Sequence, residues 1–381
     1  MLRLLLLVSQ VLVAALAGYN LFVALWGLRD QAVIRRGQRK RRVRVVIPAH
    51  NEAAVIGTLL ADLAAQTYPA DLTRVVVLAD RCTDGTVAAA ASVEVAERSS
   101  GPDGKGPAIA WYLAEQPLAP DESLVILDAD NQIPPDFLAG MVDALDNGFD
   151  AAQAYVDSSN PDESWLATAS ALSYWASSRM VQLARHNLGW TPDLGGTGTA
   201  FAPTATWVLG TPSGVLTEDS EQAARLAQSG HRIGWLHTVR VYDQKPVSMS
   251  VAMKQRARWM SGKRSVARSH RLGLISQAVR RRSWGLIDLV IRQSQPGRTF
   301  MVGIAVLLAV FSLFTDLLWP WWVWGGLALI QVLAPLVFLM RDRVPARYLW
   351  RYPLLAVFGL VWVPVRLMSA RVRGWYHTPH A

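Results

Sequence analysis

Two aspartates one residue apart are the groups in this chain most suggestive of chemistry. Asp128 and Asp130 lie in the run LVILDADNQIPP, where four apolar residues lead directly into the acids and Asn131 follows. Two carboxylates at this spacing, with no histidine or cysteine beside them, suit a hard divalent cation that keeps positions free for phosphate oxygens. The alternative is structural, because Asp and Asn also form the turns and caps that precede a helix. The pair alone leaves both interpretations open.

Two other segments carry groups that could act beside such a cation. GPDGKGPA places Lys105 in a glycine-rich loop that could approach a phosphate or a sugar. Its spacing matches neither of the common nucleotide-binding loops, and a plain turn would look the same. TEDSEQAARLAQSG begins with Glu218 and Asp219, which could be reactive carboxylates. Acids at a helix start could equally cap the helix and complement its dipole.

The segment MKQRARWMSGKR contains Gln255, Arg258 and Trp259 at a spacing that could form part of a binding site. Its basic and aromatic residues also fit an amphipathic helix that lies on a membrane surface. Both interpretations can hold together, with a site motif inside a membrane-surface helix.

The elements that must position these residues follow an alternating pattern of strands and helices. The run 52–66 has the spacing of a helix, with one apolar face formed by Val55, Leu59, Leu60 and Leu63. Apolar, β-branched runs predict strands at 43–49, 74–80, 123–130 and 150–156. The pattern predicts an α/β fold with a parallel or mixed sheet covered by helices. Such sheets bind ligands at the carboxyl ends of their strands, so Asp80 should meet the Asp128 and Asp130 pair in one crevice.

Taken in order, these segments resemble membrane-bound family 2 glycosyltransferases with the GT-A fold, a Rossmann-like nucleotide-sugar-binding domain. VVIPAHNE resembles the opening strand of the family, LADRCTDGT its second acidic motif, LDADN its metal-binding DxD motif and TED its catalytic-base motif. QRARW resembles the QxxRW motif of the cellulose, chitin, hyaluronan and poly-N-acetylglucosamine synthase branch. With AYVDSSNPDESW, LGGTGTAF and YDQKP added, the set is most similar to bacterial transferases of exopolysaccharide synthesis. The resemblance extends over about residues 43–264.

The resemblance implies a donor side and an acceptor side. Asp80 would hydrogen-bond the base of the nucleotide, Asn51 and Glu52 would line the same pocket, and Lys105 would lie near the nucleotide or the donor sugar. The acceptor side would comprise Gly196, Thr197, Gly198, Gln255 and Trp259.

The resemblance also implies a cation and a base. Asp130 would ligate Mg²⁺ or Mn²⁺, and Asp128 would contact the ribose or metal-bound groups. Asp219 would be the base, with Glu218 orienting it, and Arg258 would hold the leaving diphosphate. A hydroxyl acceptor must lose its proton as the new bond forms, and one base with one displacement predicts inversion at C1 of the sugar.

The resemblance implies sugar transfer from a nucleoside diphosphate donor, UDP being the commonest in the branch, to a membrane-associated acceptor in exopolysaccharide or glycolipid synthesis. Processive synthases of the branch have more membrane helices than the three or four expected here. The chain could therefore oligomerise, work with a synthase partner, or transfer one sugar to a polyprenyl-phosphate or ceramide-like lipid. A catalytically silent, nucleotide-sugar-binding subunit is another alternative, although every acid that the chemistry needs is present.

The composition indicates membrane contact. The 381 residues are 51% hydrophobic, include 16 Trp and carry a net charge of +9. The basic residues flank apolar segments instead of alternating with aromatic residues on a soluble face, which disfavours nucleic acid as the partner. Cys82 is the sole cysteine, which excludes an internal disulfide and fits a reducing compartment.

The first 27 residues predict a membrane anchor. They are largely apolar, carry a single charged side chain, Arg3, and are long enough to span a bilayer. A cleaved signal peptide competes, because ALA at 15–17 imitates a cleavage site, but the apolar run continues to Trp26 and RRGQRKRRVR follows. The positive-inside rule keeps this basic run in the cytoplasm, so the N-terminus should lie outside.

A second membrane region is expected near the C-terminus. The runs 300–314 and 321–340 predict a helical hairpin with a Trp-rich tip at the outer interface. The third stretch, 353–365, is short for a span, and crossing would put Arg366, Arg371 and Arg373 outside. A tilted span, a re-entrant segment and an interfacial helix remain open, and we favour a span.

These patterns predict a multi-pass protein of the bacterial inner membrane with a cytoplasmic catalytic domain. The predicted parts are a transmembrane helix at 1–27, the GT-A domain at 43–245, the QxxRW segment with amphipathic interfacial helices at 246–298 and the C-terminal transmembrane region at 299–370.

Overall fold

The computed structural model describes residues 1–210, 216–370 and 372. Arg371 and Arg373, on which the expected sidedness of the last apolar stretch depends, lie outside the described residues.

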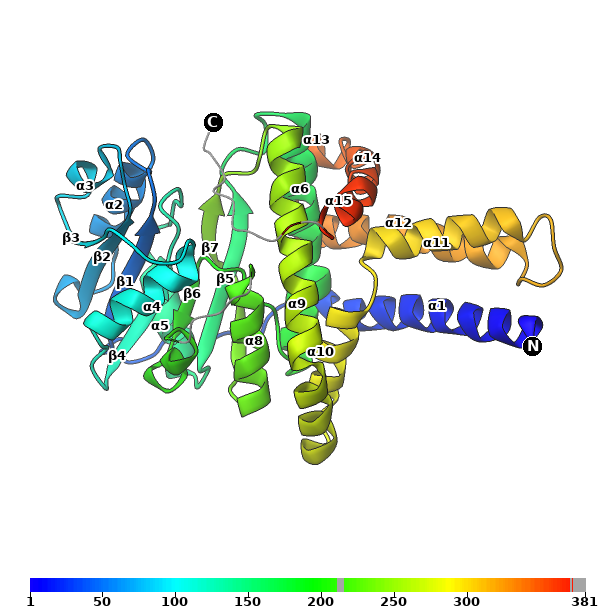
Figure 1. Cartoon of the computed structure of the whole chain (residues 1–381), viewed down its shortest axis with the longest axis horizontal. Helices are drawn as coiled ribbons and strands as arrows, with labels where there is room; N and C mark the ends of the chain where they lie inside the picture. The colour runs from blue at the N-terminus through cyan, green and yellow to red at the C-terminus, as the bar shows by residue number, and fades with distance from the viewer. Residues whose placement is uncertain (211–215, 371, 373–381) are drawn as a thin grey trace.

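One seven-stranded sheet forms the centre of the fold (Figure 1). Its strands, in spatial order, are β3 (Glu94–Arg98), β2 (Thr73–Asp80), β1 (Arg42–Ala49), β4 (Glu122–Ile126), β6 (Thr199–Phe201), β5 (Ala151–Ser158) and β7 (Ile233–Asp243). All neighbouring pairs are parallel except the two that involve β6, which runs antiparallel to β4 and to β5. The predicted mixed α/β sheet is therefore confirmed. The third predicted strand ends at Ile126, so Asp128 and Asp130 lie in the loop that follows the strand.

Helices bury both faces of the sheet because successive strand residues point to opposite sides. On β1, Val45 and Ile47 pack with α2 (Ile56–Ala64) and α5 (Phe137–Asp146) on one face. Val46 packs on the other face with α4 (Lys105–Glu115) and α8 (Glu218–Ser229). The predicted apolar face of the first covering helix differs in one position, since Ile56 is buried and Val55 is the N-cap.

Two long helical elements separate the sheet from the apolar helices (Figure 1). They are α6 (Trp165–Ser177), which continues into the π-helix η3 (Ser178–Leu183), and α9 (Met249–Arg281). The predicted motif helix is thus part of a single helix of 33 residues. Exposed apolar residues on its C-terminal half, such as Leu272 and Val279, lie among arginines, as expected of a helix at a membrane surface.

In the part of the chain that the structure describes, two helices are long and apolar enough to cross a membrane: residues 3–28, which include α1 (Leu2–Leu25), and α12 (Trp321–Arg341). The predicted span at 300–314 is α11 (Arg298–Phe311), whose 14 residues are short of the about 20 needed. It reaches that length only together with α10 (Trp284–Ser294), at a bend of 68°. Helices α11 and α12 pack on each other, and α1 extends from the same side of the molecule (Figure 1).

The stretch predicted at 353–365 forms two short helices, α14 (Leu354–Leu360) and α15 (Trp362–Met368). They pack against α6 and α9 respectively. Together they cover fewer residues than a straight span needs, so our preference for a span stays a prediction.

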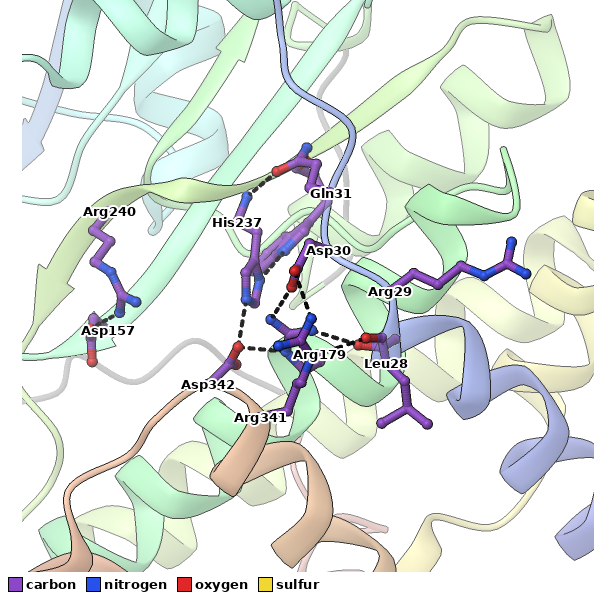
Figure 2. Close-up of polar contacts among 12 residues, drawn as sticks. Leu28, Arg29, Asp30, Gln31, Asp157, Arg179, His237, Arg240, Arg341 and Asp342 are labelled. Atoms are coloured by element: carbon purple, nitrogen blue, oxygen red, sulfur yellow. Dashed lines mark hydrogen bonds and ion pairs between the residues drawn. The ribbon is translucent and has the colours of Figure 1, made fainter.

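An ionic network, which we call the junction cluster, joins the apolar helices to the sheet (Figure 2). Its members are Asp30, Arg179, His237, Arg341 and Asp342. Arg179, buried in η3, donates to the Gly27 carbonyl at 2.9 Å and pairs with Asp30 and Asp342. His237 of β7 lies 3.0 Å from Asp342, and Arg341 contacts Asp30 at 2.6 Å. The ends of α1 and α12 are thereby fixed to a strand of the central sheet.

Candidate active site

A cavity of about 760 Å³ lies at one edge of the sheet. The parallel strands β1, β2 and β4 end at this edge, and β7 ends here with Asp243. The antiparallel β6 begins at this edge, so the loop before it, which includes Gly196 and Thr197, enters the same cavity. Helices α6, α9 and α15 contribute to the opposite wall. The topology therefore places residues from distant parts of the sequence around one space.

Asp80 lines this cavity as predicted, but two arginines hold its carboxylate. Arg98 donates to Oδ1 at 3.0 Å, and Arg81 donates to Oδ1 at 3.1 Å and to Oδ2 at 2.9 Å. These donors fix the carboxylate and offset its charge. Neither arginine was predicted from the sequence as part of the site, although Arg81 directly follows Asp80 in its motif.

The two neighbours predicted beside Asp80 differ from each other. Glu52 lines the cavity, and its backbone N–H donates to Thr86 Oγ1 at 2.8 Å. Asn51 is not among the residues that line the cavity, and its expected place beside the nucleotide stays a prediction. Its side-chain oxygen accepts the Thr83 backbone N–H at 2.7 Å, and its φ of 60° belongs to a turn. Asn51 therefore shapes the loop after β2.

The loop after β4 has a hydrogen-bonded backbone, while its acidic side chains face the cavity. The Asp128 backbone N–H donates to Asn131 Oδ1 at 3.0 Å and to Thr197 Oγ1 at 2.9 Å. Both Asp128 and Asp130 line the cavity, and the side chain of Asp128 is 42% exposed. Lys105, the first residue of α4, pairs with the Asp128 carboxylate and donates to the Gly196 carbonyl at 2.6 Å. The motif therefore forms the turn that the structural interpretation predicts, and the site interpretation is compatible with that turn.

The donor set at this loop suits a hard divalent cation. Within the described residues, no group of three or more His, Cys, Asp and Glu side chains is placed to hold a metal. Asp128 and Asp130 would supply carboxylate oxygens, and the remaining ligands would come from a bound diphosphate and water, as Mg²⁺ sites commonly require. The residues present thus fit a cation that arrives with a phosphorylated ligand.

Glu218 and Asp219 begin α8 and line the same cavity. Burial, with the adjacent Asp219 carboxylate, raises the pKa of Glu218 to about 6. Burial also raises the pKa of Asp219, partly opposed by Lys263 and by the Ser220 backbone N–H, which donates to Asp219 at 2.7 Å. Raised pKa values make these carboxylates better proton acceptors near neutral pH.

The predicted glycine loop comes close to this pair. A methyl group in place of the hydrogen of Gly196 would lie 3.6 Å from Asp219 Oδ2, and the φ of +82° at Gly196 favours glycine. Thr197 lines the cavity and fixes the loop through its bond to the Asp128 N–H. Gly198 packs closely against β7, because a Cβ there would lie 2.5 Å from Val241 Cγ1. The expected acceptor-side position of Gly198 stays a prediction.

The motif on α9 reaches the cavity with all three predicted residues, Gln255, Arg258 and Trp259. Arg258 donates to the Leu216 carbonyl at 3.3 Å, and its Nε has no hydrogen-bond partner in the described part of the chain. Its guanidinium thus retains donors for a ligand.

The structure adds cavity residues that the sequence analysis gave no role: Asp193, Asp243, Lys245, Arg256 and Lys263. Asp243 and Lys245 form an ion pair, and both belong to the YDQKP segment that had contributed to the resemblance. Arg256 lies inside the QRARW segment. Asp193 carried no signal in the sequence, since it follows no strand and belongs to no recognisable spacing.

The mixed sheet, with a cavity at the carboxyl ends of its strands, is typical of the GT-A class of fold. A family model described as glycosyltransferase-like family 2 matches residues 41–262. The chain belongs to this glycosyltransferase family. No curated protein matches the chain.

Several solved structures are similar to this chain. The mannosyltransferase PcManGT from Pyrobaculum calidifontis, in complex with GDP-Man and Mn²⁺, superimposes with a TM-score of 0.60 at 19% identity, over 97% of this chain and 99% of that chain. Residues 1–349 of S. aureus TarS give a TM-score of 0.44 at 13% identity, over 85% and 91% of the two chains. Glucosyl-3-phosphoglycerate synthase from Mycobacterium tuberculosis gives 0.41 at 20% identity, over 61% and 83%. At these identities the likeness concerns the fold alone.

Proposed function

We propose that this protein is an inverting, metal-dependent glycosyltransferase that uses a nucleoside diphosphate sugar and a membrane-associated acceptor. One observation carries the proposal. Asp128 and Asp130 line the same cavity as Asp219, and a chain of contacts runs from Asp128 through Lys105 to Gly196, which faces Asp219. A phosphate-binding end and a proton-accepting end therefore share one space.

The chain's own residues would divide the work of the reaction. Asp219 would accept the proton of the attacking hydroxyl, because its burial favours the protonated product of that step. Glu218, adjacent at the start of α8, would orient it. One base with one displacement supports inversion at C1. Arg258, with an unpartnered Nε, would bind the leaving diphosphate as it gains negative charge.

Asp128 and Asp130 would hold the divalent cation, Mg²⁺ or Mn²⁺. When bound, such a cation neutralises negative charge on the diphosphate. PcManGT carries Mn²⁺ and GDP-Man in its structure, which supports trying Mn²⁺ first. On the donor side, Asp80, Glu52 and Lys105 would contact the nucleotide or its sugar, and the arginines on Asp80 would set the orientation of its carboxylate.

The acceptor would enter from the side of α9. Gln255 and Trp259 line that wall, with Gly196 and Thr197 opposite on the loop before β6. The QxxRW motif supports the synthase branch and a UDP-sugar as the first donor to test. The apolar helices support a protein of the inner membrane with its catalytic domain in the cytoplasm. Its domain boundaries would be those predicted from the sequence. Its product would belong to exopolysaccharide or glycolipid synthesis.

Two alternatives compete with this proposal. A single transfer to a polyprenyl-phosphate or ceramide-like lipid is favoured by the few helices long enough to span a membrane in the described chain. A silent, nucleotide-sugar-binding subunit of a synthase complex would share the same pocket but would not need Asp219 in the cavity.

The test is a panel assay on the full chain in nanodiscs with Mn²⁺. UDP- and GDP-sugars are offered with bacterial membrane lipid extract, and nucleoside diphosphate release is measured for wild type, Asp219→Asn and Asp130→Ala. Metal-dependent release that both variants lose supports the transferase and identifies the donor. Donor binding without release under any acceptor would support the silent subunit. The size of the product then separates one transfer from polymerisation.

A further inference from the structure

Arg256 is a buried cation in the cavity wall, and no acid among the described residues pairs with it. It lines the cavity from α9, and 4% of its surface is exposed. Its Nε and Nη1 have no hydrogen-bond partner in the described structure, and its Nη2 makes only a 3.3 Å bond to Ser170. Burial lowers the pKa of Arg256 to about 10, and the nearby Tyr174 phenol, not a carboxylate, opposes that shift. A charge buried without a partner costs free energy, which an anionic ligand would offset.

Two other cavity cations, Lys105 and Lys245, differ from Arg256 because each has an acidic partner. Lys105 pairs with Asp128, and Lys245 pairs with Asp243, so both have an acid within the protein. Arg256 instead lies against two aromatic rings, 3.9 Å from the Phe358 centroid and 5.2 Å from the Trp362 centroid. Aromatic faces attract the cation without using its N–H donors. The guanidinium therefore keeps unused N–H donors on Nε and Nη1, which point from different edges of the group, so each would bind a phosphate oxygen singly.

The position of the site indicates what carries the phosphate. Phe358 and Trp362 belong to α14 and α15, whose other faces expose Val357, Leu360 and Leu367, with Leu360 70% exposed. These short helices lie beside the apolar helices at the membrane-facing side of α6 and α9 (Figure 1). Helices α14 and α15 therefore cover a cation on the side of the cavity and expose apolar side chains on their other side. A ligand that joins a phosphate to a hydrocarbon chain matches both surfaces.

We infer that Arg256, roofed by Phe358 and Trp362, binds the phosphate group of a lipid acceptor while the acceptor's hydroxyl reaches Asp219. The inference rests on the proposed function and narrows its acceptor to a phosphate-bearing membrane lipid. The phosphate is a handle for binding and does not itself attack the sugar. The two ends of the cavity then bind two different phosphorylated molecules, the donor at the sheet edge and the acceptor beneath α14 and α15.

The test measures lipid binding by the full chain in phosphatidylcholine nanodiscs that contain either phosphatidic acid or diacylglycerol. These lipids differ by one phosphate group. Wild type should bind phosphatidic acid more tightly, and Arg256→Gln should weaken that binding by about tenfold to a hundredfold, as expected for lost charge-assisted hydrogen bonds. Diacylglycerol binding should not change. Arg256→Lys, which keeps the charge, should retain part of the preference, and Arg268→Gln on the exposed surface of α9 is the matched control.

Other outcomes overturn the inference. Equal losses for both lipids in Arg256→Gln would assign the residue to packing of the roof. Competition by inorganic phosphate as strong as that of phosphatidic acid would indicate a site for a free anion. Weaker binding of nucleoside diphosphate with Mn²⁺ in the variant would assign Arg256 to the donor. Because donor binding and lipid binding are measured separately, a wild type that binds phosphatidic acid selectively but releases no nucleoside diphosphate refutes the proposed function alone.

Discussion

Two buried arginines, Arg179 and Arg256, illustrate opposite uses of the same side chain. Arg179, in the junction cluster, donates to Gly27 and pairs with Asp30 and Asp342. Arg256, in the cavity wall, pairs with no acid in the described chain and leaves two nitrogens unbonded. Both are almost fully removed from solvent. A satisfied buried charge holds elements together, whereas an unsatisfied one marks a place where a ligand completes the set.

The largest expected effect concerns a cavity charge. Asp219→Asn should lower sugar transfer by about 10²- to 10⁴-fold, because the amide cannot accept the proton. The thermal unfolding midpoint should stay equal or rise, since the change removes a charge that burial disfavours. Transfer rates and unfolding curves of the same preparation check this. Undiminished transfer would remove Asp219 from the proposed chemistry.

The matching change in the junction cluster should act on stability. Arg179→Gln leaves Asp342 and Asp30 without this partner, and breaking a buried ion pair costs about 3–5 kcal/mol. Denaturant or thermal unfolding in detergent measures the loss. Arg74→Gln, which breaks an exposed pair with Glu94, is the control and should cost at most about 1 kcal/mol. Similar losses for both would remove the distinction between the two clusters.

The pH dependence of activity should reveal the cavity acids. The pKa of Glu218 is raised from 4.5 to about 6, so the pair carries its full charge only above that pH. Transfer should fall as the pH drops below about 6, because protonated Glu218 no longer orients Asp219 as its carboxylate, and the pKa of Asp219 itself is also raised by burial. Stability should respond with the opposite sign, because a raised carboxyl pKa makes ionisation unfavourable in the folded state. This contribution is most favourable below pH 4.5 and is lost as pH rises to about 6. Rate and unfolding profiles over this window test both signs.

The smallest effect should be that of Arg256 on stability. Arg256→Gln loses a cation–π contact with Phe358 but relieves an unpaired buried charge, so the free energy of unfolding should change by less than about 1 kcal/mol. Unfolding of this variant beside Arg179→Gln gives the contrast directly. A loss as large as that of Arg179→Gln would mean that Arg256 is held by contacts as strong as an ion pair.

Local pattern sufficed for much of the site. Apolar strands ending near Asp80, Asp128 and Asp130 predicted a shared crevice, and the cavity contains all three. Asn51 and Gly198 belong to the same set of motifs, and in the structure Asn51 accepts a hydrogen bond within a turn while Gly198 packs against β7. Membership in a motif does not say whether a residue faces the ligand or supports the surrounding backbone.

The helices of the membrane side were harder to predict. Hydropathy located α1 and α12, since length and apolarity are properties of the chain itself. The bend of 68° between α10 and α11 and the docking of α14 and α15 depend on packing between distant segments. No periodicity within 353–365 indicates that Phe358 and Trp362 lie against an arginine about one hundred positions earlier.

The sequence by itself determined the α/β class, the acids at the strand ends, the apolar helices and the motifs that place the chain in its family. These depend on residue type and spacing, which the chain carries locally. The tertiary structure alone decided which charges are paired. Arg98 meets Asp80, Arg179 meets Asp342, and Arg256 meets no acid in the described residues. Pairing depends on distances between segments far apart in sequence, and only the folded sheet with its covering helices sets those distances.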